Sequence, residues 1–236
     1  MGHPTVLVFV RSPDPTFPTR GFLNNLSYPD VRLVGSYRLD EDESAEAARA
    51  EHRDAFEATL REQAEQFEQR GIRTETDLVF SADPVETRRR IAERDDVDAI
   101  LTPGGADTLG TVLIASRHTE NADAKVSWLL GVLDRDDLLA VDLIHVADPN
   151  DAEAEAAGER VLREVRSVLV DEDVPPTKIS QEVRTGEDVA FELSQAARDH
   201  DLLVMGETEQ DIGDKIFGPV SDYVVNERDV PVLIVR

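Results

Sequence analysis

The chain has 236 residues, and its 50 Asp and Glu against 25 Lys and Arg give a formal net charge of −25 at pH 7. A surface this negative repels nucleic acids and anionic membranes unless a local basic stripe overrides it, and the sequence has no such stripe. The absence of cysteine excludes disulfides, thiolate metal sites and thiol nucleophiles.

Strands and helices are expected to alternate along the first half of the chain. Short apolar runs predict strands at 5–10, 31–37, 72–80 and 98–102, and apolar residues at helical spacing predict a long helix over 48–67. A capping-box pattern at 83–86 predicts the start of another helix. The proline-rich segment 11–27 takes the place of a regular first helix and has no predicted structure.

The second half gives a clearer alternation of the same kind. Apolar runs predict strands at 111–115, 140–146, 178–183, 202–205 and 231–235, and helical spacing predicts helices over 122–133, 154–168, 189–197 and 218–226. Strands separated by helices pair in parallel through right-handed crossovers, with helices on both faces of the sheet. We therefore predict an α/β fold with two tandem units, a truncated or irregular one at 1–109 and a complete one at 110–236 with a five-stranded parallel sheet.

The segment 202–236 (LLVMGETEQDIGDKIFGPVSDYVVNERDVPVLIVR) carries the most information about function. A buried strand ending in Met-Gly, a loop with glycines, a helix and a terminal Pro-Val-Leu-Ile-Val strand resemble the C-terminal signature of the universal stress protein family. The resemblance covers the second half and, more loosely, the first. It implies tandem units of the adenine nucleotide alpha hydrolase-like fold.

In members of this family that bind ATP, the resemblance implies a loop of the form Gly, two residues, Gly, nine residues, Gly, then Ser or Thr. Such glycines let backbone N–H groups approach phosphate oxygens. Gly206 matches the first glycine and Gly218 the last, but Glu209 replaces the second, the loop to Gly218 is one residue short, and Pro219 replaces the hydroxyl residue. We interpret the motif as degenerate.

The charge of this loop also opposes phosphate. Glu207, Glu209, Asp211 and Asp214 surround the place where a triphosphate would lie, with Lys215 as the only cation nearby in the sequence. Each carboxylate within about 4 Å of a phosphate opposes it by roughly 1 kcal/mol even in a water-like dielectric. A bound Mg²⁺ would reverse the sign, so ATP with Mg²⁺ stays as the alternative to having no cofactor.

A second family feature is an Asp after the first strand, which contacts the nucleoside. Arg117 stands at that position, and Arg11 stands at the matching place in the first half. An arginine at the carboxyl edge of an open α/β sheet can hold an anion, although a surface ion pair is the more common role. The candidate cofactor-binding residues are Arg117, Val146, Met205, Gly206, Gly218 and Val220. No catalytic or metal-binding residues are predicted.

Composition suggests where the protein works. Only Lys125, Lys178 and Lys215 are lysines, and few lysines among many carboxylates are typical of proteins that work in molar salt. An ordinary acidic cytosolic protein is the alternative. No apolar run approaches the roughly 18 residues of a membrane helix, and the start of the chain lacks a signal-peptide pattern. We expect a cytoplasmic protein of halophilic type without a membrane-inserted segment.

Three functions follow from these observations. The favoured one is a non-catalytic regulatory or interaction protein that has lost nucleotide binding, and the alternatives are an ATP or AMP sensor and a nucleotide-using enzyme of related fold. The resemblance implies a homodimer formed by edge-to-edge pairing of the last strand, Val232 to Val235, because an apolar terminal strand left unpaired is a liability. By analogy, a membrane transporter is a possible protein partner.

Overall fold

The computed structural model describes residues 4–12, 15–25, 30–83, 87, 90, 91, 93, 97–119, 122–133, 136–206, 224 and 229–236. The strands are β1 (Thr5–Ser12), β2 (Asp30–Arg38), β3 (Thr74–Ser81), β4 (Ala99–Thr102), β5 (Thr111–Ala115), β6 (Ala140–Ala147), β7 (Ile179–Thr185), β8 (Leu202–Gly206) and β9 (Val232–Val235). The helices are α1 (Arg20–Asn24), α2 (Ala45–Glu68), α4 (Ala122–Val132), α5 (Ala154–Asp171) and α6 (Val189–Ala197), and a short 3₁₀ turn, η1 (Pro176–Lys178), precedes β7.

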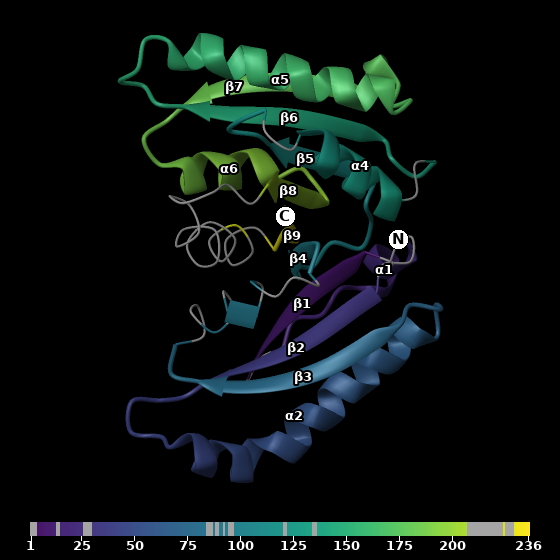
Figure 1. Ribbon diagram of the computed structural model, residues 1–236, viewed down its shortest axis with the longest axis vertical. Helices are drawn as coiled ribbons and strands as arrows, with labels where there is room; N and C mark the ends of the chain where they lie inside the picture. The colour runs from purple at the N-terminus through teal and green to yellow at the C-terminus, as the bar shows by residue number, and fades with distance from the viewer. Residues whose placement is uncertain are drawn as a thin grey trace.

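All of these strands form one mixed sheet that runs through the length of the molecule (Figure 1). Its order is β3-β2-β1-β4-β9-β8-β5-β6-β7. The four strands of the first half are parallel to one another, and so are the five strands β5 to β9. The two sets meet at β4 and β9, which pair antiparallel.

The terminal strand β9 lies in the interior of the sheet. It pairs in parallel with β8, where Leu203 faces Val232, and antiparallel with β4, where Thr102 faces Val232. The expectation that Val232 to Val235 is a sheet edge that pairs with a second copy of the chain is therefore wrong as to the edge, because β4 of the first half occupies that side of β9. A homodimer of this chain stays a prediction, but β9 has no free side with which to form one.

The predicted strands lie where the apolar runs placed them, with ends shifted by two residues or fewer. Among the α-helices that the structure describes, α1 was missed: it lies inside the proline-rich segment that had no predicted structure. Thr19 caps it, because its hydroxyl accepts a hydrogen bond from the Phe22 backbone N–H at 3.1 Å and donates one to the Ala106 carbonyl at 2.7 Å. The helix predicted over 218–226 lies outside the described residues, apart from Val224.

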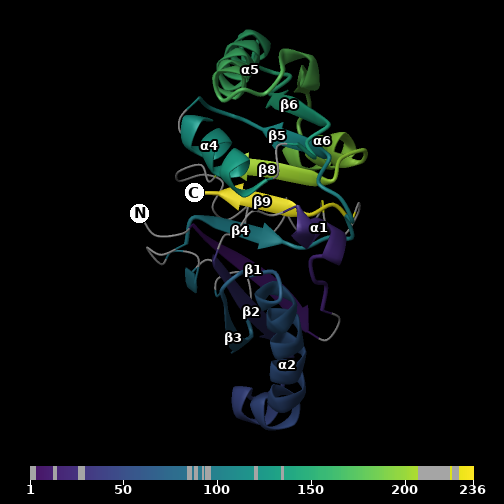
Figure 2. The same cartoon turned by 90° about the vertical axis from the view of Figure 1, so that its right-hand side faces the viewer.

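The helices divide between the two faces of the sheet. In Figure 2, α4 and α6 lie on opposite sides of β5 and β8. One apolar core joins the sheet to α2, α4 and α5, and a second core joins its other face to α6. This arrangement leaves the carboxyl ends of β5, β6 and β8 between helices of both layers, where open α/β sheets bind ligands.

Candidate functional site

The candidate site is the carboxyl edge of the neighbouring strands β6, β5 and β8. Ala115, the last residue of β5, faces Met205 on one side and Ile144 on the other. Gly206 ends β8, and Arg117 follows β5 by two residues. The structure therefore brings four predicted residues to one edge. The other two, Gly218 and Val220, lie outside the described residues.

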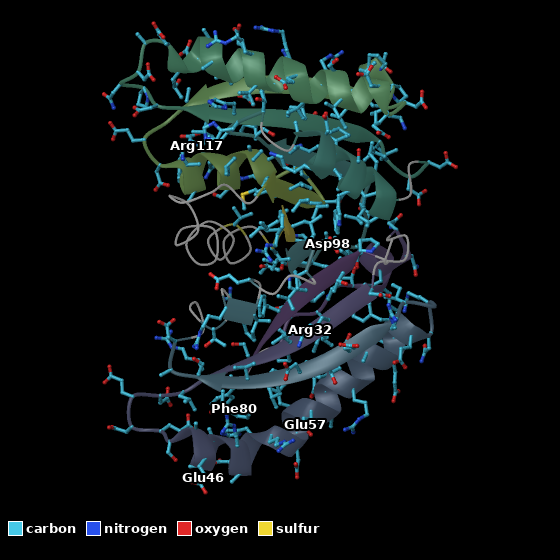
Figure 3. All side chains as sticks on the ribbon, viewed as in Figure 1. Arg32, Glu46, Glu57, Phe80, Asp98 and Arg117 are labelled. Atoms are coloured by element: carbon cyan, nitrogen blue, oxygen red, sulfur yellow. The ribbon has the colours of Figure 1, made fainter. Side chains whose placement is uncertain are left out.

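These residues are divided between the two faces of the sheet. Met205 is buried and Val146 half-buried, and both pack in the core that contains α6. Arg117 is exposed at the end of the second half's sheet (Figure 3). Gly206 follows Met205 and, by strand alternation, faces the opposite layer, which is formed by α4. The backbone of Gly206 therefore faces α4, the first helix after β5.

Lys125 on α4 is the residue that reaches it. Its side chain is 7% exposed, and it lies on the face of α4 that carries Ala122, Val126 and Leu129 into the core. A methyl group built on Gly206 would lie 2.7 Å from Lys125 Cδ and 2.8 Å from Lys125 Nζ. The lysine chain therefore covers Gly206 and occupies the space in front of it.

The ammonium of Lys125 has no counter-ion in the described part of the chain, where it forms neither a hydrogen bond nor an ion pair. Burial lowers the pKa of Lys125 below its ordinary value of 10.5. A charged group removed from water disfavours its charged form unless an opposite charge compensates it. The hydroxyl of Ser116, which lines the same small cavity as Lys125, is also buried and has no hydrogen-bond partner among the described residues.

No space for a ligand exists beneath Lys125. The small cavity bounded by Ser116, Lys125, Val204 and neighbouring apolar side chains of α4, α5 and β5 has no volume that a water molecule could enter. A phosphate group is larger than water, so it cannot enter this cavity while Lys125 holds its position. Any anion at the edge has to lie outside Lys125 or displace it.

The histidines near the edge have structural roles or lie in solvent. His145 Nδ1 lies 2.9 Å from the Ser116 carbonyl oxygen, and its ring packs so closely on α5 that a methyl group on Gly158 would lie 2.4 Å from His145 Cδ2. His118, which follows Arg117, is exposed. Within the described ranges, no three His, Asp or Glu side chains gather in a way that could hold a metal ion.

Comparison with known proteins identifies the family. A sequence model described as "Universal stress protein family" matches residues 108–236, just over half of the chain. The chain belongs to the universal stress protein family. No curated protein matches it. In the described part of this universal stress protein, no helix is both long enough and apolar enough to cross a membrane.

Solved structures agree with this fold along nearly the whole chain. A universal stress protein from Archaeoglobus fulgidus DSM 4304 is 14% identical, with a TM-score of 0.51 and coverage of 98% of this chain and 98% of that chain. A functionally unknown protein from Pseudomonas aeruginosa PAO1 is 12% identical, with a TM-score of 0.53 and coverage of 99% of this chain and 92% of that chain. At such identities the likeness concerns the fold alone.

Sequence reasoning missed Lys125 as a residue of the site, although a signal was present. Lys125 stands three residues after Ala122 and four before Leu129, so it falls on the apolar face of a predicted helix. It is also one of only three lysines in the chain. The signal was thus a rare cation on the apolar face of the helix that directly follows β5. A side chain in that position can reach the carboxyl edge of the sheet.

Proposed function

We propose that this universal stress protein is a non-catalytic regulatory protein that acts by contacting another protein and does not hold ATP at Gly206. The observation that carries the proposal is the position of Lys125. The family resemblance assigns to Gly206 the backbone that phosphates approach, and the buried side chain of Lys125 covers that backbone. A triphosphate would have to displace a side chain whose aliphatic part is packed in the core.

The sequence of the following loop supports the same proposal. Glu209 stands at the second glycine position and Pro219 at the hydroxyl position, so the loop has lost a flexible residue, an O–H donor and an N–H donor. The loop itself lies outside the described residues. The support here comes from its composition, which replaces phosphate-binding donors with like charge.

The order of the strands supports a tandem organisation. In the first half, β3-β2-β1-β4 follow the order third, second, first, fourth, and β7-β6-β5-β8 repeat that order in the second half before β9 completes it. We infer two units divided near Gly110, with β9 pairing on β4 where a complete first unit would have a fifth strand of its own. In this arrangement the contact between units takes the place of the dimer contact through β9.

The second candidate function is an ATP or AMP sensor, and one observation favours it. Lys125 provides an ammonium without a counter-ion in the described part of the chain, beside a Ser116 hydroxyl without a partner. A phosphate oxygen placed outside Lys125 would compensate that charge, and Arg117 lies at the same edge. The sensor would therefore need Lys125 to turn outward toward the nucleotide.

A titration of ATP with Mg²⁺ into the purified protein in molar KCl separates the two candidates. We expect no binding heat in the micromolar range, because Lys125 covers Gly206 and the loop repels phosphate. Lys125→Ala, which uncovers the glycine, tests whether the lysine alone blocks the site.

Binding at micromolar concentration that disappears in Gly206→Glu would replace the proposed function with the sensor. Turnover of the nucleotide in the same assay would identify an enzyme. A specific protein recovered together with a chain that binds no nucleotide would support the regulatory role. We also propose that the protein is of halophilic type and cytoplasmic. The titration is therefore carried out at high salt concentration.

A further inference from the structure

A groove far from the nucleotide edge lies between helix α2 and the edge strand β3 in the first half. Its volume is about 500 Å³, which is within the usual range for ligand sites, roughly 300–1,000 Å³. Residues of α2 line one side and residues of β3 the other: Arg49, Arg53, Glu57, Leu60, Arg61, Thr76, Asp77, Leu78 and Phe80. Figure 3 labels Glu57 on α2 and Phe80 on β3, the two elements that bound the groove.

The charges of α2 are separated between its faces. The helix carries three arginines and seven carboxylates. All three arginines line the groove, but only one of the carboxylates, Glu57, does so. A helix face that contacts only water is expected to carry charges of both signs, because pairs of opposite charge at helical spacing are the more stable arrangement. In a chain of net charge −25, this groove is a local concentration of positive charge.

Two of these guanidinium groups are available to a ligand. Arg53 is paired with Glu57, with Nε and Oε1 2.6 Å apart, and Asp77 is paired with Arg32 at 3.7 Å. Arg49 Cζ lies 5.7 Å from the centre of the Phe80 ring, which orients its guanidinium without using its hydrogen-bond donors. Arg61 has no ion pair or hydrogen bond in the described part of the chain. The carboxylates of the groove are therefore occupied, while Arg49 and Arg61 keep their donors.

The other side of the groove offers backbone groups. β3 is the last strand at its end of the sheet and pairs only with β2 in the described part of the chain. Thr76 and Asp77 are exposed on it. An edge strand presents a row of backbone N–H and C=O groups to which an extended segment can add.

The spacing of the arginines fits an extended occupant. Arg49, Arg53 and Arg61 stand at multiples of four residues on α2, and each step of four residues is about 6 Å along the axis. Arg49 and Arg61, which keep their donors, are three such steps apart, about 18 Å. Side chains on one face of a β-strand repeat every two residues, about 6.7 Å. Carboxylates at alternate positions of a strand lying along β3 would therefore meet the arginine row of α2 nearly in register.

We propose that the groove between α2 and β3 binds an extended acidic peptide segment of a protein partner, which adds to the edge of β3 and places two carboxylates of one strand face, six residues apart, against Arg49 and Arg61. The arginine fork matches a carboxylate in a bidentate geometry. The position of the peptide that faces Glu57 takes an uncharged residue. This inference rests on the proposed regulatory function for its biological role, but its site and its ligand are separate from the nucleotide edge.

The test uses the full chain and a fluorescent peptide in which Glu alternates with Thr, except that Thr also takes the position facing Glu57. Anisotropy is measured in 0.2 M and 1 M KCl. Binding is expected in the micromolar range and weaker at the higher salt concentration. The affinity of the variant Arg49→Gln/Arg61→Gln for the peptide is expected to be at least about tenfold lower. Arg20→Gln/Arg160→Gln changes the net charge equally at exposed arginines of α1 and α5, and it is expected to bind like the unchanged protein.

Three results would overturn the proposal. The first is equal binding of the peptide by the two double variants. The second is equal binding of the alternating peptide and of a peptide with the same Glu residues grouped in one block. Either result would mean that only net charge matters. The third is binding of pyrophosphate without binding of the peptide, which would identify a small phosphate compound as the occupant. None of these results affects the ATP titration, because that titration concerns Gly206 and Lys125.

Discussion

Gly21→Ala is expected to lower the free energy of unfolding by about 3 kcal/mol or more, because the added methyl group has no space. A Cβ at this position would lie 1.8 Å from the backbone carbonyl oxygen of Asp107 and 2.8 Å from its carbonyl carbon. Both atoms belong to the main chain, so no side-chain rotation can relieve the overlap. Either α1 or the segment that joins β4 to β5 has to move.

This substitution tests how α1 packs on the segment that joins β4 to β5. Phe22 and Leu23 of α1 are buried in the core that the sheet forms with α2, α4 and α5, and the Thr19 hydroxyl donates a hydrogen bond to the Ala106 carbonyl. The measurement is urea unfolding followed by circular dichroism. Gly131→Ala is the matched control, because a methyl group there meets nothing within 4 Å; it should raise stability by about 0.5 kcal/mol. Equal stability of the two variants would contradict the described position of α1.

Lys125→Met is expected to raise the free energy of unfolding by about 1–3 kcal/mol at pH 7. It removes a buried charge that has no partner among the described residues, and it keeps a chain of similar length. For a chain of this size, each kcal/mol corresponds to about 2–4 °C in Tm. Most substitutions of buried residues destabilise, so a gain here would be specific to the electrostatic position of Lys125.

The gain should depend on pH in a defined direction. Burial lowers the pKa of Lys125 in the folded protein below its value of 10.5 in the unfolded chain. Between these two values the unfolded chain binds more protons than the folded one, so the stability of the unchanged protein rises with pH. The advantage of Lys125→Met is therefore largest below the folded-state pKa and shrinks as the pH approaches 10.5.

Unfolding in urea at a series of pH values from 7 to 10 measures this advantage. Arg160→Met is the control, because it removes a cation of α5 that is exposed to water; its effect should not change with pH. A constant difference between Lys125→Met and the unchanged protein would show that Lys125 is not desolvated. A loss of stability in Lys125→Met at pH 7 would mean that the ammonium has a counter-ion.

The α/β fold could be predicted because its signals are local. Each strand is a short apolar run, and each helix shows its own spacing, so the order of elements follows from the sequence without knowledge of the contacts. The pairing of β9 with β4 could not be predicted in this way. The hydrophobic pattern predicts where a strand lies in the sequence but not which strand it pairs with. An edge strand that forms a dimer and a central strand of one sheet are both apolar, so the pattern does not distinguish them.

The site was predicted only in part for a similar reason. The resemblance located Gly206 and Arg117, which the structure places at one edge. It gave no indication of Lys125, because a lysine on a helix face is usually solvated and its burial depends on packing against β8. The α2 groove was missed because its arginines are separated by acidic residues in the sequence, and only the helix brings them to one side.

Crystals grown in the presence of ATP and Mg²⁺ test most directly whether the nucleotide position is occupied by the protein itself. The expected result is electron density for the Lys125 side chain against Gly206 and no density for adenosine phosphates at the carboxyl ends of β5 and β8. Density for a nucleotide whose phosphates lie against Gly206, with Lys125 turned away from the glycine, would contradict it.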